Sequence, residues 1–172
     1  TLINWQASTF DNTGNFITVG NTQNGATSDM LITAIDPNGS TLWQKTYDHD
    51  GAVDFATEVE TDIFNNIYVI GSGHSISTNS LDYVLLKYDA NGNLLMNVAY
   101  NGSGNSNDTP VDLVLDGAGD IYITGSSIGS GSMTDFTTVK FDATGNFIWE
   151  SRYDYTQLED VPVGITLHNN QL

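Results

Sequence analysis

The sequence predicts an all-β protein built from β-propeller blades, and three observations carry this prediction. The same Asp-initiated hairpin recurs every 53 residues, at Asp36, Asp89 and Asp142. Each repeat contains four strand-like runs separated by turn residues. Nothing in the repeat has the apolar spacing of a helix. A period of about 50 residues with four strands in each unit is typical of propeller blades.

Matched residue columns define the repeating unit. These columns are Asp29, Asp82 and Asp135; Gly20, Gly71 and Gly125; Trp43, Met96 and Trp149; Tyr47, Tyr100 and Tyr153; and Asp54, Asp108 and Asp160. We predict three four-stranded antiparallel blades over residues 3–53, 54–107 and 108–159, and the first strand of a fourth blade over 160–172, in a single segment 1–172. Propellers typically close with about 4 to 8 blades. We therefore expect further blades from a longer chain, or an open arc completed by other copies or other chains.

The third unit shows the four strands in order, as TPVDLVLD, DIYITGSS, DFTTVKFD and NFIWESRYD. In the second unit, the second and third strands are apolar at both parities, that is, at odd and even positions alike, over Ile67 to Ile70 and over Tyr83 to Leu86. A strand that is apolar on both faces must be covered on both faces, and neighbouring blades supply that cover. The recurrent glycine at the end of the second strand predicts a bend there.

The connections fall into two groups that lie at opposite ends of the blades. One group is short and uniform, as in DNTGN, DPNGS, DANGN and DATGN, where Asp starts the turn and Gly or Asn accepts a positive φ. We interpret these aspartates and glycines as structural. The other group is uneven, as in SGHSISTNSL, SSIGSGSMT and DHDGAV. Divergent loops on a scaffold are where binding usually resides, so this end is predicted to bind a protein or glycan partner; simple solvated loops are the alternative.

The stretch YDHDGAVD contains the sharpest local cluster of carboxylates. Asp48, Asp50 and Asp54 lie close together around a glycine, and oxygen ligands of this kind suit a hard cation such as calcium. The spacing does not match an EF-hand loop. A solvated acidic loop without a metal is the alternative.

Further acidic and histidine residues occur at the same end of the blades. The binding-face candidates are His74, Asp108, Asp154, Glu159 and Asp160. Asp54, Asp108 and Asp160 open the innermost strand of successive blades and could form a ring of carboxylates that holds a cation. The alternative is that each one binds backbone amides and caps a loop. The three histidines are interpreted as surface residues in loops, and the tryptophans of the outermost strand as packing between blades.

Composition excludes several classes of function. The chain carries 21 Asp and Glu residues against 4 Lys and Arg, for a formal charge of −17. Such a field repels phosphate backbones and anionic lipids, so we expect neither nucleic-acid binding nor membrane insertion. The absence of cysteine from the sequence excludes thiol chemistry and Cys-based zinc sites. No nucleophile with a matching base stands out, and we expect no enzymatic activity.

Several phrases of the chain resemble a known repeat. DGAGDIYITG, LDYVLLKYDANGNLL and TDFTTVKFDATGNFIW are similar to the SBBP repeat, a bacterial β-propeller repeat. The resemblance covers essentially the whole chain. It implies a large exported or cell-surface bacterial protein, often one with a type IX sorting domain, and it implies no general set of catalytic residues.

The sequence therefore predicts a non-enzymatic propeller scaffold or binding module of an exported bacterial surface protein. Two alternatives stay open at this point. One is a structural protein whose open blades stack or are completed by other chains. The other is a fragment of a carbohydrate-active propeller enzyme whose catalytic residues lie mostly in other blades.

Overall fold

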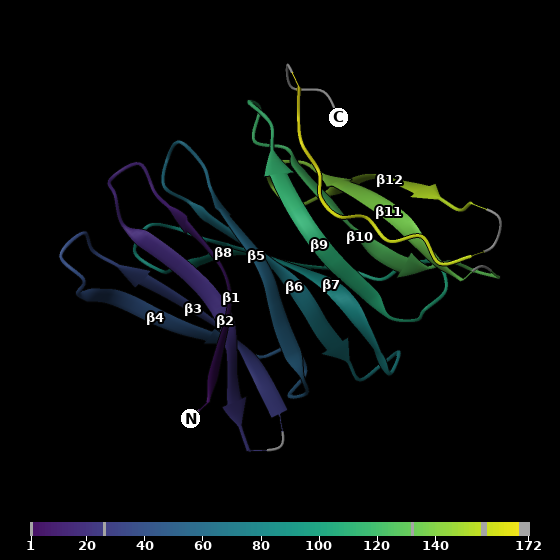
Figure 1. The fold of residues 1–172 in the computed structure, drawn as a ribbon, viewed down its shortest axis with the longest axis horizontal. Helices are drawn as coiled ribbons and strands as arrows, with labels where there is room; N and C mark the ends of the chain where they lie inside the picture. The colour runs from purple at the N-terminus through teal and green to yellow at the C-terminus, as the bar shows by residue number, and fades with distance from the viewer. Residues whose placement is uncertain (1, 26, 132, 156–157, 169–172) are drawn as a thin grey trace.

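The computed structural model describes residues 2–25, 27–131, 133–155 and 158–168. They form three four-stranded antiparallel sheets that fan out side by side (Figure 1). Blade 1 contains β1 (Ile3–Phe10), β2 (Phe16–Asn24), β3 (Thr27–Ile35) and β4 (Thr41–Tyr47). Blade 2 contains β5 (Asp54–Thr61), β6 (Ile67–Ser75), β7 (Ser80–Tyr88) and β8 (Leu94–Tyr100). Blade 3 contains β9 (Asp108–Leu115), β10 (Ile121–Ile128), β11 (Thr134–Phe141) and β12 (Phe147–Tyr153). The all-β fold with propeller-like blades is thus confirmed.

Each sheet follows the chain order, and the first strands of neighbouring sheets lie in contact. Strand β5 contacts both β1 and β9, which places these three strands on the inner side of the fan. The outermost strands are β4, β8 and β12. This is the arrangement that the four-strand repeat predicts.

The middle blade is buried on both faces. On β6, Ile67 and Val69 pack into the core shared with blade 1, while Tyr68 and Ile70 pack into the core shared with blade 3. All four side chains are at most 1% exposed. The apolar residues at both parities therefore serve two separate cores, as expected, and blade stacking buries the surface that holds the fold together.

The recurrent glycine of the second strand lies opposite a β-bulge in the first strand. The register shifts next to Gly20 in blade 1, next to Gly71 in blade 2 and next to Gly125 in blade 3. A Cβ atom on Gly71 would overlap the carbonyl oxygen of Phe55 on the bulged strand. Glycine is required because the two backbones approach too closely for any side chain, and the predicted bend is this bulge.

The uniform turns lie at one end of the blades, which we call the turn end: the connections that follow β1, β3, β5, β7, β9 and β11. In each one, the Asp Oδ1 accepts two backbone N–H groups, from the residues two and four positions later. The six aspartates are Asp11, Asp36, Asp62, Asp89, Asp116 and Asp142. Glycine has a positive φ in five of these turns and Asn65 in the sixth. The structural interpretation of these residues is confirmed.

Residues of the outer strands reach across to the next blade. The indole Nε1 of Trp43 donates to the Ala90 carbonyl oxygen at 3.0 Å. A Cβ on Gly145 would lie 2.9 Å from the Met96 sulfur. Both contacts confirm packing between blades. Trp149 instead packs edge-on against Tyr122 of its own blade, with ring centroids 6.1 Å apart.

The last described segment is extended and lies along blade 3 (Figure 1). The Asp160 N–H donates to the Thr134 carbonyl oxygen at 2.8 Å, and the Ile165 N–H donates to Asp112 Oδ2 at 2.9 Å. Residues 169–172 of the predicted fourth-blade strand lie outside the described residues. Among the residues that the structure describes, no helix is long and apolar enough to cross a membrane.

Candidate functional site

The end opposite the turns, which we call the loop end, comprises the connections that follow β2, β4, β6, β8, β10 and β12. Its loops differ from blade to blade, and they expose both apolar and acidic side chains. The exposed apolar residues are Ile76, Met133, Tyr155 and Leu158. The exposed acidic residues are Asp48, Asp50, Asp154 and Glu159. The loop end can therefore offer apolar contacts within a negative field.

Three repeated aspartates anchor the loops. Asp54, Asp108 and Asp160 each accept a short hydrogen bond from a backbone N–H of the preceding connection. The pairs are His49 N to Asp54 Oδ2 at 2.6 Å, Gly102 N to Asp108 Oδ2 at 2.6 Å, and Tyr155 N to Asp160 Oδ2 at 2.7 Å. The expectation that these residues cap loops is confirmed, because in each case Oδ2 accepts a backbone N–H of the preceding connection.

Two of these anchors are fully buried, and their pKa values are raised. Asp54 and Asp108 are both 0% exposed. Burial raises the pKa of Asp54 to about 7, and the nearby charges of Asp48 and Asp29 add to the effect. Burial also raises the pKa of Asp108 to about 6, although the charge of Arg152 acts in the opposite direction. Both carboxyl groups therefore titrate well above the usual range for aspartate.

Blade 3 contains its own counter-charge. Ser127 of β10 pairs with Asp108 on one side and with Asp135 on the other. Arg152 lies over this row: its Nη1 is 3.1 Å from Asp135 Oδ2 and 2.7 Å from the Ser127 carbonyl oxygen, and its Nη2 is 2.9 Å from Ser127 Oγ. The Asp135 side chain is 1% exposed. The guanidinium thus neutralises a buried row of acidic groups.

The corresponding row in blade 2 is built differently. Gly73 of β6 pairs with Asp54 and Asp82, and Ala99 occupies the repeat position that Arg152 occupies in blade 3. The loop residue His49 fills part of the space, because a Cβ on Gly73 would lie 3.0 Å from the His49 Cβ. The Nδ1 of His49 is 3.1 Å from the hydroxyl oxygen of the neighbouring tyrosine of β4. The two blades therefore use the same acidic positions with different partners.

The structure brings together a different set of acidic residues from the one predicted. Asp48 and Asp54 gather with Asp29, and one carboxylate oxygen from each lies within 4.8 Å of the others. Asp50 instead accepts a hydrogen bond from the Ile76 N–H, at 3.3 Å, through Oδ2. In the sequence, Asp29 stands out only as a member of a repeated column. Because it belongs to blade 1 and Asp54 to blade 2, only the stacking of blades reveals their proximity.

The other predicted candidates are dispersed over the loop end. His74 lies on strand β6 rather than in a loop, since the β6–β7 ladder continues to the pair Ser75 and Ser80; the interpretation as a loop residue was wrong. His74 is half-buried, and its backbone N–H donates to the Val53 carbonyl oxygen at 3.1 Å. The remaining candidates, Asp154, Glu159 and Asp160, belong to the connection that follows β12.

Sequence reasoning missed one feature of the turn end. Ile63 and Phe64 form the tip of the β5–β6 turn and are 80% and 75% exposed. They border a groove that continues to Leu115 and Ala118 at the corresponding turn of blade 3. The signal was present in the sequence, because DIFNN carries two large apolar residues where the matching turns DNTGN and DGAGD carry none.

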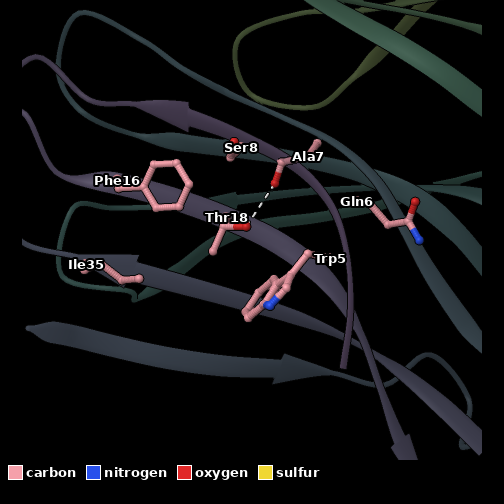
Figure 2. A pocket seen from close by; sticks show the side chains of 7 residues that line it. All are labelled: Trp5, Gln6, Ala7, Ser8, Phe16, Thr18 and Ile35. Atoms are coloured by element: carbon pink, nitrogen blue, oxygen red, sulfur yellow. Dashed lines mark hydrogen bonds between the residues drawn. The ribbon is translucent and has the colours of Figure 1, made fainter. Parts of the chain in front are cut away.

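The outward face of blade 1 carries a second apolar groove (Figure 2). Trp5, Phe16 and Ile35 line it, and the Thr18 hydroxyl donates to the Ala7 carbonyl oxygen at its centre, at 3.1 Å. The Trp5 side chain is 47% exposed. This face is the repeat equivalent of the blade 2 face that packs against blade 1.

Comparison with known proteins supports the fold. No protein-family model and no curated protein matches the chain. Among solved structures, the chain is similar to one described as a crystal structure of the eukaryotic initiation factor, with a TM-score of 0.53 and 10% sequence identity. The match covers 95% of this chain and 36% of that chain, so this chain spans about a third of its length. Together with the sheet order, the likeness defines the class of protein as a partial, propeller-like β fold.

Proposed function

We propose that this chain is a non-enzymatic propeller module of an exported bacterial surface protein, and that its loop end binds a protein partner. The observation that carries the proposal is the difference between the two ends of the blades. Six turns share one hydrogen-bond pattern at the turn end, whereas the loop-end connections differ in length and residue type. Divergent loops on a repeated, rigid scaffold are typical of binding surfaces.

The chemistry of the loop end favours a basic partner. The exposed tips Ile76 and Tyr155 offer apolar anchors; Asp50 accepts a hydrogen bond from the Ile76 N–H, and Asp154 directly precedes Tyr155. Apolar and aromatic anchors in a charged rim are typical of protein interfaces. The net charge of −17 would attract a cationic protein surface and repel an anionic one. The resemblance to the SBBP repeat and the polar composition support export and a longer parent chain.

The experiment compares two isoleucines of similar exposure at opposite ends of the molecule. Ile76 lies at the loop end and Ile63 at the turn end, and they are 65% and 80% exposed. The protein and its Ile76→Ser and Ile63→Ser variants are crosslinked to proteins of the source cell surface, and bound partners are identified by mass spectrometry. We expect Ile76→Ser to lose a specific partner that Ile63→Ser retains. The reverse pattern would assign binding to the turn end.

A parallel screen tests the enzymatic alternative. The protein is incubated with a panel of glycans and polysaccharides, and both binding and chain cleavage are measured. The proposal predicts no cleavage. Turnover that disappears when single loop acids such as Asp154 or Glu159 are changed to the corresponding amide would replace the scaffold function with an enzymatic one.

A second candidate function is assembly through open blade faces, and the groove of Figure 2 favours it. In blades 2 and 3, the equivalent face is covered by the preceding blade. Exposed Trp5 on this face would gain burial if another blade docked there. Light scattering over a range of concentrations tests this function: self-association that Trp5→Ser abolishes would support it, and a monomer at all concentrations would contradict it.

A further inference from the structure

Three carboxylates meet where blade 1 contacts blade 2. Asp29 comes from β3, Asp48 from the connection after β4, and Asp54 from the start of β5. One oxygen from each lies within 4.8 Å of the other two. Like charges at this separation repel strongly where water is partly excluded, so the ionised cluster requires either protons or a counter-cation.

Asp54 provides a second observation that points to a ligand. Its side chain is 0% exposed, and its Oδ2 is already engaged with the His49 N–H. Its Oδ1 is buried and has no hydrogen-bond partner within the described part of the chain. A buried carboxylate oxygen without a hydrogen-bond partner carries a desolvation penalty that a bound cation would offset. Asp54 therefore has one carboxylate oxygen, Oδ1, that is available to bind a ligand.

The next blade junction places a protein cation beside the equivalent aspartate, although Asp108 Oδ1, like Asp54 Oδ1, has no hydrogen-bond partner within the described residues. Asp108 corresponds to Asp54, and Arg152 lies beside it: a Cβ on Gly102 would be 2.9 Å from Asp108 Oδ1 and 3.3 Å from Arg152 Nη2. Asn101 stands there in place of Asp48, which removes one negative charge. The junction of blades 1 and 2 thus has one carboxylate more and one guanidinium fewer than the junction of blades 2 and 3.

Three of the four basic residues of the chain have other partners, and the fourth, Lys45, reaches the β7–β8 turn, where a Cβ on Gly92 would lie 3.1 Å from its Cε. Ion pairs of the described residues join Lys140 to Asp120, and Arg152 to Asp135 and Glu150. Lys87 lies over the ring of a tyrosine on β6, 4.7 Å from its centroid. A counter-cation for the Asp29 cluster is therefore best supplied from solution.

We propose that Asp29, Asp48 and Asp54 bind one hard divalent cation of the calcium type, which ties blade 1 to blade 2. Calcium accepts about 6 to 8 oxygen ligands in irregular geometry, so water and main-chain carbonyl oxygens of the exposed connection would complete its shell. Asp48 is exposed, which gives the ion a route from solvent. This inference is independent of the partner proposed for the loop tips.

The test uses two matched variants of one loop. Asp48→Asn removes a ligand charge, keeps an oxygen for the Gly51 N–H, and installs the residue that the fold already uses at Asn101. Asp50→Asn makes the same charge change in the same connection, outside the cluster. Chelator-treated protein is titrated with CaCl2 by calorimetry, and melting is followed with and without about 1 mM Ca²⁺, the range of extracellular sites.

We expect a single Ca²⁺ site in the unmodified protein and a higher melting midpoint in calcium. Asp48→Asn should weaken the affinity at least about tenfold, equivalent to about 1.4 kcal/mol, and Asp50→Asn by less than about twofold. An unmodified protein that neither binds Ca²⁺ nor shifts its midpoint would overturn the proposal. Equal weakening by both variants would also overturn it, because that result describes a diffuse acidic surface rather than a site.

Discussion

Replacing Arg152 by alanine tests whether the guanidinium neutralises the acidic row of blade 3. The change removes the ion pair to Asp135 and the bonds to both oxygens of Ser127. It leaves the carboxylate of Asp135, 1% exposed, without its counter-charge. Asp108, whose pKa Arg152 lowers, is left with burial as the dominant influence.

The magnitude follows from the burial of the pair. Breaking a buried ion pair by removing one partner costs about 3 to 5 kcal/mol. The Arg152 side chain is 18% exposed, so water can partly replace it, and we expect a loss of about 3 kcal/mol at pH 8. The pKa of Asp108 is already raised to about 6, and removal of Arg152 raises it further. A group whose pKa is raised on folding contributes stability at low pH that is lost as the pH rises.

The loss in the Arg152→Ala variant should therefore shrink at acid pH, because protonation of Asp108 removes one of the charges that the arginine balanced. The assay is urea unfolding of both proteins at pH 8 and pH 5, followed by circular dichroism and tryptophan fluorescence. Arg152→Lys is the control. It keeps the positive charge but cannot donate the two parallel hydrogen bonds to Ser127, so its loss of stability should be intermediate. A loss that is the same at both pH values, or below about 0.5 kcal/mol at pH 8, would refute the electrostatic reasoning.

Three further predictions concern the blades and the loop anchors. Gly71→Ala should destabilise the fold by about 2 to 3 kcal/mol in urea unfolding, because its Cβ would overlap the Phe55 carbonyl oxygen; an unchanged midpoint would contradict the close approach. Trp43→Ala should cost about 2 to 3 kcal/mol in the same assay, since a half-buried ring and its bond to Ala90 are lost. In calcium-free buffer, thermal stability should fall as the pH rises from about 4 to about 7, because the pKa of Asp54 is raised to about 7; Asp54→Asn should flatten this profile.

The blade architecture could be predicted because it depends on residues that recur in every unit. The period of the aspartate turns and the apolar residues at both parities of β6 and β7 each report local structure. The recurrent glycine also predicted a bend, although the bulge opposite it could be identified only from the strand pairing, in which Gly71 lies opposite Ala56 and close to the Phe55 carbonyl oxygen. Repetition thus converts weak local signals into a firm prediction of fold.

The candidate site was harder to predict, because it depends on contacts between repeats. Asp48 and Asp54 are close in sequence, but Asp29 reaches them only across the blade junction. Arg152 of blade 3 corresponds to Ala99 of blade 2, and Gly102 corresponds to His49. These differences between the blades can be interpreted only when the structure shows which of these residues lie beside the buried aspartates. His74 was misplaced because a polar run of Ser, Gly and His reads as a loop, whereas the backbone ladder carries it into β6.

The two families of aspartates give the molecule an electric asymmetry along the axis of the blades. Turn-end carboxylates such as Asp89 and Asp36 have lowered pKa values, owing to hydrogen bonds from Asn93 and Ser40 respectively. Buried loop-end carboxylates such as Asp54 have raised values. Between about pH 4 and pH 7 one end stays anionic while the other takes up protons, so the dipole moment changes with acidity. On a positively charged support, mildly acidic buffer should therefore weaken attachment through the loop end more than attachment through the turn end.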